Sequence, residues 1–276
     1  MHIDKSQVKA WHACSEGFRW FLDKFPQGGA YADVHGALIA DKRYDDARWL
    51  VEQMYRTFLD SAEFIQAETA VTDKMVGELT SMNHPSDQVE GENGSGNDAQ
   101  IGSSGNYAQI GSSGYNARIG SSGDDARIGS SGYNARIGSS GNYARIGSSG
   151  NDAQIGSSGD DARIGSSGDD ARIGSSGDDA QIGSSGNDAQ IGSSGDDARI
   201  GSSGYNAQIT ATGNGSVVAC AGSVERIVLG ENGCASVPWH DGKRIRIAVA
   251  YVGENGIEAN IPYYVNDEGQ FVRVED

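Results

Sequence analysis

The apolar positions of residues 97–209 recur every nine residues, in the pattern x-x-Ala-[Gln/Arg]-Ile-Gly-Ser-Ser-Gly. There are 13 copies, whose isoleucines run from Ile101 to Ile209. Ala and Ile lie two residues apart, so both point to one side of an extended segment, and the Gln or Arg between them points to the other side. Gly-Ser-Ser-Gly follows as a turn, in which we expect the glycines to adopt positive φ. The period therefore predicts short strands that stack as a β-solenoid over shared columns of Ala and Ile.

The size of one coil follows from the space that its side chains need. One repeat is too short to enclose two rows of side chains. We therefore predict that two repeats, about 18 residues, form one flattened coil with a short strand on each face. Odd and even repeats would then lie on opposite faces. With a strand spacing of ~4.8 Å, the 13 repeats would form about six and a half coils and a rod of roughly 30 Å.

Residues 1–80 show helical spacing instead. We expect a first helix from a Ser6 cap to about Phe25, a second over 32–41, a third from Tyr44, and a weaker helical pattern that continues to Leu79. The apolar residues of these segments fall mostly on one face, which predicts a helical domain with a small core of its own. That predicted core contains Trp11, Phe18, Trp20, Phe21, Trp49 and Leu50.

The two remaining segments differ from both patterns. Residues 81–96 are polar and contain glycine, as is typical of a linker. Residues 210–276 begin where the nine-residue repeat decays, and they alternate apolar and polar positions as ordinary strands do, for example over 244–252 and 257–265. We expect this segment to be a small antiparallel β cap that closes the end of the solenoid.

Composition and charge limit the possible partners. The chain has 276 residues with 41 glycines and 4 prolines, and the strict register of the glycines indicates a repeat rather than disorder. A net charge of -17 disfavours direct binding to nucleic acid or to anionic membranes, and suits a partner protein with a basic surface. The three cysteines, Cys14, Cys220 and Cys234, do not form a disulfide framework, and neither a signal peptide nor a membrane-spanning run is visible. We therefore expect a soluble cytoplasmic protein, and a homodimer stays open.

Two stretches of the N-terminal region are familiar. Cys14-Ser-Glu-Gly-Phe-Arg-Trp-Phe21 and Tyr44-Asp-Asp-Ala-Arg-Trp-Leu50 resemble a helical N-terminal module of uncharacterised phage and prophage proteins. Those proteins similarly continue into glycine-rich repeats with Ile-Gly-Ser-Ser-Gly runs. The resemblance implies a phage setting and a host cell as the location. It supplies no catalytic residues.

Two known kinds of repeat protein are partial matches. Aligned from its first glycine, the repeat is similar to the calcium-binding β-roll nonapeptide G-G-x-G-x-D-x-U-x. However, the sixth position is Asp in only 8 of 13 copies and the apolar positions are out of phase, which favours a metal-free solenoid. The spacing of the Ala-x-Ile-Gly-Ser-Ser-Gly repeat is also similar to that in the heads of trimeric autotransporter adhesins. The export signal and the membrane anchor that those proteins need are not visible. Ice binding would require a flat ladder of threonines, whereas the outward strand residue here is Gln or Arg.

No arrangement of residues points to catalysis. The five histidines do not stand at metal-ligand spacing with one another or with cysteine, and Cys14 has no neighbouring base. We expect Cys14 to be a buried cysteine of a helix. The Gly-Ser-Ser-Gly serines are explained as turn residues, and a phosphate-binding loop would need a following helix and a Lys-[Ser/Thr] pair. We therefore predict no catalytic residue, no metal, no cofactor and no enzymatic activity.

Aspartates in the variable pair of each repeat are the remaining candidate for function. If one coil holds two repeats, the even repeats place eight of them on one side, in a row that Arg127, Arg163 and Arg199 would partly neutralise. Rows of carboxylates on a rigid rod imitate a phosphate backbone in some pentapeptide-repeat proteins, and the alternative is that Asp, Asn and Tyr simply solvate turns. The candidate binding residues are Asp124, Asp125, Asp160, Asp161, Asp178, Asp179, Asp196 and Asp197.

Two hypotheses follow. In the first, the protein is a phage-encoded, non-enzymatic inhibitor that occupies the nucleic-acid-binding site of a host protein such as a defence nuclease. In the second, it is a structural spacer or adhesin-like repeat protein, in which the ends of the rod make the contacts.

Overall fold

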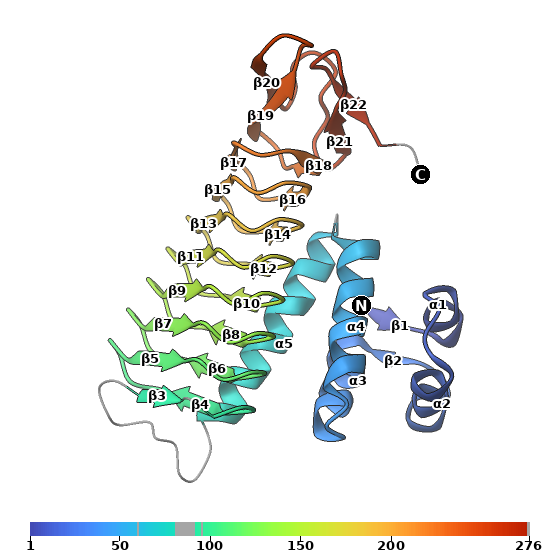
Figure 1. Ribbon diagram of the computed structural model, residues 1–276, viewed down its shortest axis with the longest axis vertical. Helices are drawn as coiled ribbons and strands as arrows, with labels where there is room; N and C mark the ends of the chain where they lie inside the picture. Colours follow the sequence, from blue (N-terminus) through green and yellow to red (C-terminus); the bar gives the residue numbers. More distant parts are fainter. Residues whose placement is uncertain (60, 81–91, 95, 275–276) are drawn as a thin grey trace.

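The computed structural model describes residues 1–59, 61–80, 92–94 and 96–274. A straight stack of β-coils carries a helical domain along one side and a small group of strands at its C-terminal end (Figure 1). The helical domain includes the short antiparallel pair β1 (His2–Ile3) and β2 (Gly29–Ala30). Its helices are α1 (Lys5–Ala10), α2 (Ser15–Lys24), α3 (Tyr31–Ala40), α4 (Tyr44–Phe58) and α5 (Ala62–Thr80).

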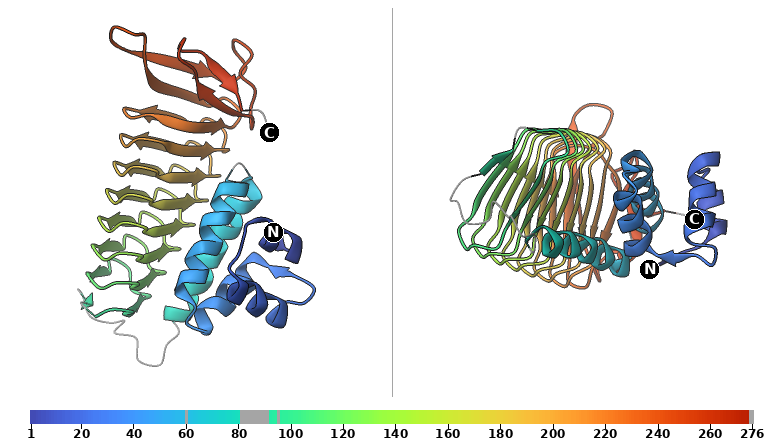
Figure 2. Two further views of the ribbon diagram at one scale, coloured as in Figure 1. Left: turned by 45° about the vertical axis from the view of Figure 1, so that its right-hand side comes forward. Right: turned by 90° about the horizontal axis from the view of Figure 1, so that it is seen from below.

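The coils alternate between two sheets, which face each other across the solenoid (Figure 2). The sheet that lies against the helical domain is called the covered sheet here. It contains β4 (Gln100–Ser103), β6 (Arg118–Ser121), β8 (Arg136–Ser139), β10 (Gln154–Ser157), β12 (Arg172–Ser175), β14 (Gln190–Ser193), β16 (Ala207–Ala211), β18 (Val224–Leu229), β21 (Pro262–Val265) and β22 (Phe271–Arg273).

The other sheet is called the open sheet here. It contains β3 (Glu92–Gly94), β5 (Gln109–Ser112), β7 (Arg127–Ser130), β9 (Arg145–Ser148), β11 (Arg163–Ser166), β13 (Gln181–Ser184), β15 (Arg199–Ser202), β17 (Val217–Cys220), β19 (Cys234–His240) and β20 (Ile245–Tyr251).

The strand register confirms that one coil consists of two repeats. Within the repeats, neighbouring strands of each sheet pair in parallel with partners two repeats apart, as Ile155 does with Ile173 and Ile164 with Ile182. The hydrogen bond from Asp178 to Asp160 spans the same 18 residues. Odd and even repeats therefore lie in different sheets, as the period predicts. Each coil stacks the same side chains on the coil before it, so the columns of the core are continuous along the rod.

Three columns of side chains fill the solenoid. The Ala and Ile columns are buried as expected, for example Ala162 at 0% and Ile164 at 3% exposure. The first serine of Gly-Ser-Ser-Gly is also inside, and Ser139 and Ser157 have no exposed surface. The repeat pattern predicts both serines in the turn. The strand in fact extends through the first serine, and the two-residue alternation of an extended chain then points it inward.

The turn chemistry differs from the expectation. The left-handed residue of each turn is the second residue of the repeat, with φ of 56° at Asp125 and 54° at Asn134, and not a glycine. Asp and Asn tolerate this conformation better than most residues. The last glycine of each repeat is required by stacking instead, because a Cβ on Gly168 would lie 2.5 Å from the carbonyl carbon of Gly150 in the preceding coil.

The first expected helix is two helices. Asp4, rather than Ser6, caps α1, and it forms a reciprocal capping box with Gln7. The chain then turns at His12, whose φ is 59°, before α2 begins. Cys14 is the N-cap of α2, where its Sγ accepts a hydrogen bond from the Gly17 N–H at 3.2 Å. This cysteine is exposed and therefore differs from the buried helical cysteine that the sequence suggested.

The helical domain has its own apolar core. Phe21, Leu50, Met54 and Phe64 are almost fully buried in it. The other aromatic residues expected in this core pack around it with part of their surface exposed, among them Trp11, Phe18, Trp20 and Trp49. Burial of side chains of this size stabilises a fold by about 1.5–3 kcal/mol each.

Helix α5 joins the two parts of the molecule. It lies along the covered sheet and contacts β4, β6, β8, β10, β12 and β14 (Figures 1 and 2). Its side chains rest on the glycines that follow the isoleucines of this sheet. Thr72 lies against Gly156, for example, and Ile65 lies against Gly192. One helical turn rises about 5.4 Å, close to the ~4.8 Å between strands, so successive turns of α5 meet successive coils.

The C-terminal strands form the expected cap. Parallel stacking continues past residue 209, because β18 pairs in parallel with β16 and β19 with β17. The later strands pair antiparallel, β20 with β19, β21 with β18, and β22 with β21. Antiparallel strands thereby cover the C-terminal edge of the parallel stack in each sheet.

In the part of the chain that the structure describes, no helix has the length and apolar content that crossing a bilayer requires.

Candidate functional site at the acidic corner of the solenoid

The predicted aspartates lie together at one corner of the solenoid. They occupy the first two positions of the repeats that lead into β7, β11, β13 and β15 of the open sheet, so each coil of this stretch has one such pair of positions. Asn142 and Tyr143 interrupt the row, which leaves three consecutive coils with an aspartate pair each. This acidic corner consists of Asp124, Asp125, Asp160, Asp161, Asp178, Asp179, Asp196 and Asp197.

The first aspartate of each pair has a structural task. The Oδ1 of Asp160 accepts a hydrogen bond from the backbone N–H of Asp178 in the next coil at 3.0 Å, and Asp178 accepts one from Asp196 at 2.8 Å. Asn142 does the same for Asp160 at 2.9 Å. Either Asp or Asn therefore completes this ladder, which links each turn to the next. The second carboxylate oxygen is left for other partners.

The second aspartate of each pair adopts the left-handed conformation. Its φ is 56° at Asp161 and 55° at Asp179. Its backbone N–H donates to a carbonyl of the next coil, as Asp161 does to Asp178 at 2.9 Å. The side chain makes no contribution to this bond and lies at the outside of the corner. In the same row Tyr143 adopts a φ of 58°, which is unusual for an aromatic residue.

The carboxylates of the corner are open to solvent. Asp160, Asp178 and Asp196 are exposed, as are Asp179 and Asp197. Within the described residues, Arg127, Arg163 and Arg199 form no ion pair with the row, so the expected neutralisation is absent at contact distance. Screening by solvent and hydrogen bonds from backbone N–H groups reduce the repulsion between neighbouring carboxylates.

The opposite corner of the solenoid is formed by the first two positions of the odd repeats, and it contacts α4. Its Asp152 forms an ion pair with Arg48 of α4 at 3.6 Å. At Asp170 burial, followed by the neighbouring carboxylates Asp152 and Asp188, raises the pKa above its ordinary value. Two exposed tyrosines, Tyr115 and Tyr133, stack on this side with ring centres 5.5 Å apart. The acidic corner borders the helical domain as well, because Ser158, two residues before Asp160, donates a hydrogen bond to Asp73 of α5 at 2.7 Å.

The outer face of the open sheet, beside the acidic corner, has free space above its glycines. A Cβ on Gly147, Gly165 or Gly183 would meet no atom within 4 Å, whereas the equivalent glycines of the covered sheet touch α5. This difference cannot be predicted from the repeat, because the two sheets have the same nine-residue pattern. A signal was present in α5, where Ile65, Thr69, Thr72, Val76 and Leu79 follow the alternating spacing of four and three residues that gives a helix one continuous face.

In the described ranges of the chain, no three His, Cys, Asp or Glu side chains come together as a group that could hold a metal ion. The acidic corner spaces its carboxylates along a line rather than around a point, which suits an extended charged partner better than an ion.

Comparisons with known proteins match the two parts of the chain separately. Residues 1–59 match the YdhT N-terminal domain family, which covers α1 to α4 and both stretches on which the phage resemblance rests. The uncharacterised protein YdhT of Escherichia coli is 39% identical over 75 residues, which are 27% of this chain and 28% of YdhT.

The repeats match another kind of protein. An ice nucleation protein of Pseudomonas syringae is 58% identical over 36 residues, which are 13% of this chain and 3% of that protein. No solved structure matches the chain. Each match spans less than a third of the curated relative, so the chain is similar to only a part of each of these proteins. The chain is thus a repeat β-solenoid that is similar to YdhT at its N-terminus and to ice nucleation proteins in its repeats.

Proposed function

We propose that this protein is a non-enzymatic binding protein and that its acidic corner receives the basic surface of a partner protein. The observation that carries the proposal is the alignment of Asp160, Asp161, Asp178, Asp179, Asp196 and Asp197 on three adjacent coils. They are spaced regularly, with one pair in each coil, and the glycines of the open-sheet strands that follow them have free space around them.

The charge density of this row supports imitation of nucleic acid. Two carboxylates per coil at a spacing of ~4.8 Å correspond to one negative charge per ~2.4 Å of the rod. B-DNA carries one per about 1.7 Å. A groove that binds a nucleic-acid backbone would therefore meet a comparable line of charge. We accordingly propose a nucleic-acid-mimicking inhibitor whose partner is a host nucleic-acid-binding protein, such as a nuclease, in the host cytoplasm. The phage setting is part of the proposal and comes from the resemblance alone.

The test uses substitutions that keep the turn. Asn already stands in the ladder at position 142, so D160N, D161N, D178N and D179N together remove four charges while the hydrogen bonds are retained. The matched control is the triple change D169N, D170N and D188N at the opposite corner. The tagged protein is incubated with bacterial lysate, and the captured proteins are challenged with duplex DNA.

The proposal expects a captured nucleic-acid-binding protein that DNA displaces. Single Asp→Asn changes at the corner should have small effects, and the quadruple variant should lose most of the capture while the control retains it. Binding should also weaken with added salt, because charges across solvent are screened over about 8–10 Å at physiological ionic strength. Capture that is equal for all variants would reduce the aspartates to solvated turn residues.

A structural spacer is the second candidate, and the likeness of the repeats to ice nucleation proteins favours it. Deletion of residues 196–213 removes one coil of two repeats and keeps the register of the stack. It also leaves β4 to β14, on which α5 rests, in place. A spacer whose ends make the contacts should retain its binding after this deletion and in the quadruple Asp→Asn variant. Loss of binding in the quadruple variant would reject it.

A further inference from the structure

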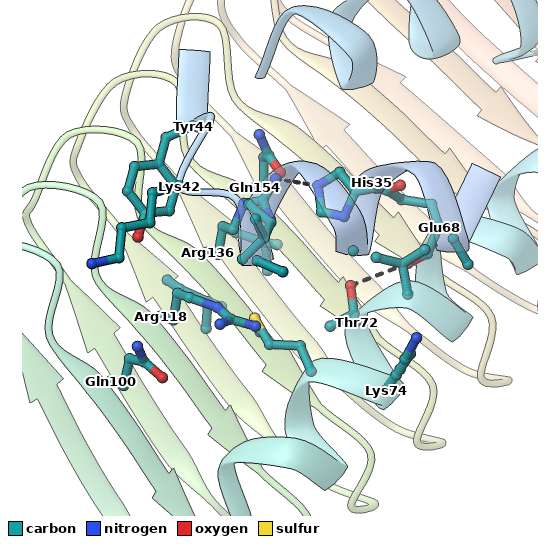
Figure 3. Close-up of a pocket in the computed structure, with 18 residues that line it drawn as sticks. His35, Lys42, Tyr44, Glu68, Thr72, Lys74, Gln100, Arg118, Arg136 and Gln154 are labelled. Atoms are coloured by element: carbon teal, nitrogen blue, oxygen red, sulfur yellow. Dashed lines mark hydrogen bonds between the residues drawn. The ribbon is translucent and has the colours of Figure 1, made fainter. Parts of the chain in front are cut away.

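The helical domain and the covered sheet form a partly open cavity of ≈ 380 Å³ between α3, α5 and the strands β4 to β10. Figure 3 shows the polar side chains that reach it from three directions. Arg118 and Arg136 come from the covered sheet, Lys74 comes from α5, and Lys42 follows α3. The outward Gln and Arg positions of the repeat face solvent in the open sheet, whereas the helical domain covers them at this place.

The charge of the cavity is opposite to that of the protein. Within the described residues, four cationic side chains line it, Lys42, Lys74, Arg118 and Arg136, and one carboxyl group, that of Glu68. The whole chain carries 38 acidic against 21 basic residues. A local excess of positive charge in such a chain is unexpected from composition, and it is concentrated where the two parts of the molecule meet.

Arg136 is held by a neutral partner. Its Nη2 donates to the Nε2 of His35, which is 4% exposed. Burial, followed by the charges of Arg136 and Arg118, lowers the pKa of His35 well below its usual range, so the ring is neutral and accepts this bond. Among the described residues, no carboxylate lies within ion-pair distance of Arg136. Burial lowers the pKa of this arginine to about 10, while the charge of Glu68 acts in the opposite direction.

The one carboxyl group nearby is already engaged. Glu68 is 7% exposed, and its Oε2 accepts a hydrogen bond from the hydroxyl of Tyr31. Burial raises the pKa of Glu68 above its ordinary value. Glu68 also faces Arg172, which is 4% exposed and whose Nε and Nη1 have no hydrogen-bond partner among the described residues. In the part of the chain that the structure describes, the buried guanidinium groups of Arg136 and Arg172 thus have one carboxyl group near them.

We propose that the cavity binds a small organic phosphate monoester. Guanidinium groups match the oxygens of a phosphate in a bidentate arrangement, and the two lysines suit its second negative charge. The aliphatic side chains of Ile39, Val71 and Met75, which also line the cavity, suit the organic part. The bound molecule would contact α3, α5 and the covered sheet together, and so would fasten the helical domain to the solenoid.

The experiment uses the intact protein with phenyl phosphate and inorganic phosphate as probes, measured by titration calorimetry and by thermal unfolding. The test variants are R118Q and R136Q, and the controls are R127Q and R145Q at the same repeat position of the open sheet. Gln occupies this position naturally at Gln100, Gln109 and Gln154, so all four variants fit the fold. Benzoate and sulfate serve as comparison anions.

We expect saturable binding of phenyl phosphate and a concentration-dependent rise in Tm. Loss of a hydrogen bond to a charged group costs about 1.5–3 kcal/mol. R136Q should therefore weaken binding by roughly 10- to 100-fold, while R127Q and R145Q should bind as the parent does. The absence of saturable binding at millimolar phenyl phosphate would overturn the proposal. So would equal binding of benzoate or sulfate, or equal weakening in the open-sheet controls, because each would show a general response to charge.

Discussion

Thr72 of α5 occupies the space that a side chain on Gly156 would need. A Cβ on this glycine would lie 2.8 Å from the Cβ of Thr72. The same position in the next strand of the chain, Gly165, belongs to the open sheet and has free space around it. Two glycines with the same local sequence thus have different roles, and the difference arises from the helix that covers one of them.

This relationship predicts opposite outcomes for one substitution at two places. G156V should displace α5 from the covered sheet and destabilise the protein by about 1–3 kcal/mol, the usual cost of overpacking. G165V should change stability little, because a valine suits an exposed strand position. Urea unfolding of the two variants, side by side, makes the comparison. Equal stability would show that α5 does not rest tightly on this sheet.

The inward direction of the isoleucine column is open to a direct test. Ile164 is 3% exposed, so I164D places an unpaired charge inside the solenoid and should cost roughly 3–5 kcal/mol. The control is R163Q, one residue earlier, which faces solvent and should leave the melting curve unchanged. A normal melting curve for I164D would show that the strand phase is wrong.

The stacking glycines should tolerate no side chain at all. In G168A the new methyl group would approach the carbonyl group of Gly150, which is backbone and has no other conformation to adopt. We expect a loss of about 3 kcal/mol or more, at the upper end of overpacking costs. G165A in the same repeat is the control, and its added methyl group meets nothing within 4 Å. Thermal unfolding that ranks the two alike would contradict the stacking argument.

Stability should fall below neutral pH through His35. The folded protein holds the pKa of this histidine well below the ordinary value of 6.5, with burial as the main cause and Arg136 next. Below pH 6.5 the unfolded chain therefore binds a proton that the folded protein does not, so acid favours unfolding. Between pH 7 and pH 5.5 this histidine should account for a loss of about 1 kcal/mol.

The variant H35Q isolates this contribution. Its amide oxygen still accepts a hydrogen bond from Arg136, but the side chain does not titrate. The free energy of unfolding of H35Q, measured by urea at both pH values, should fall less than that of the parent by the amount expected for the histidine. If the two proteins lose stability in parallel, then another group controls the response.

The N-terminal region shows where sequence patterns mislead at short range. Apolar spacing suggested one helix to Phe25, but it does not reveal the left-handed turn at His12, because that turn breaks the backbone without breaking the apolar face. The cap was likewise assigned to Ser6 although Asp4 is an equally good capping residue two positions earlier. Helix ends depend on a few backbone angles that several sequences satisfy about equally well.

The sequence by itself determined the solenoid. An unbroken nine-residue period leaves few ways to bury Ala and Ile, and the space needed inside one coil sets its length at two repeats. From that length the acidic corner follows, since equivalent residues of successive coils must stack. These features come from local geometry repeated many times, so every copy of the repeat supports the same answer.

Only the tertiary structure decided which face of the rod is free. Repeats with the same pattern form both sheets, and the choice between the sheets depends on α5, a segment outside the repeat. The same docking encloses Arg136, His35 and Glu68 and creates the cationic cavity. The periodic pattern cannot distinguish its own two sides. The physical reason is that packing between distant segments breaks a symmetry that the repeat preserves.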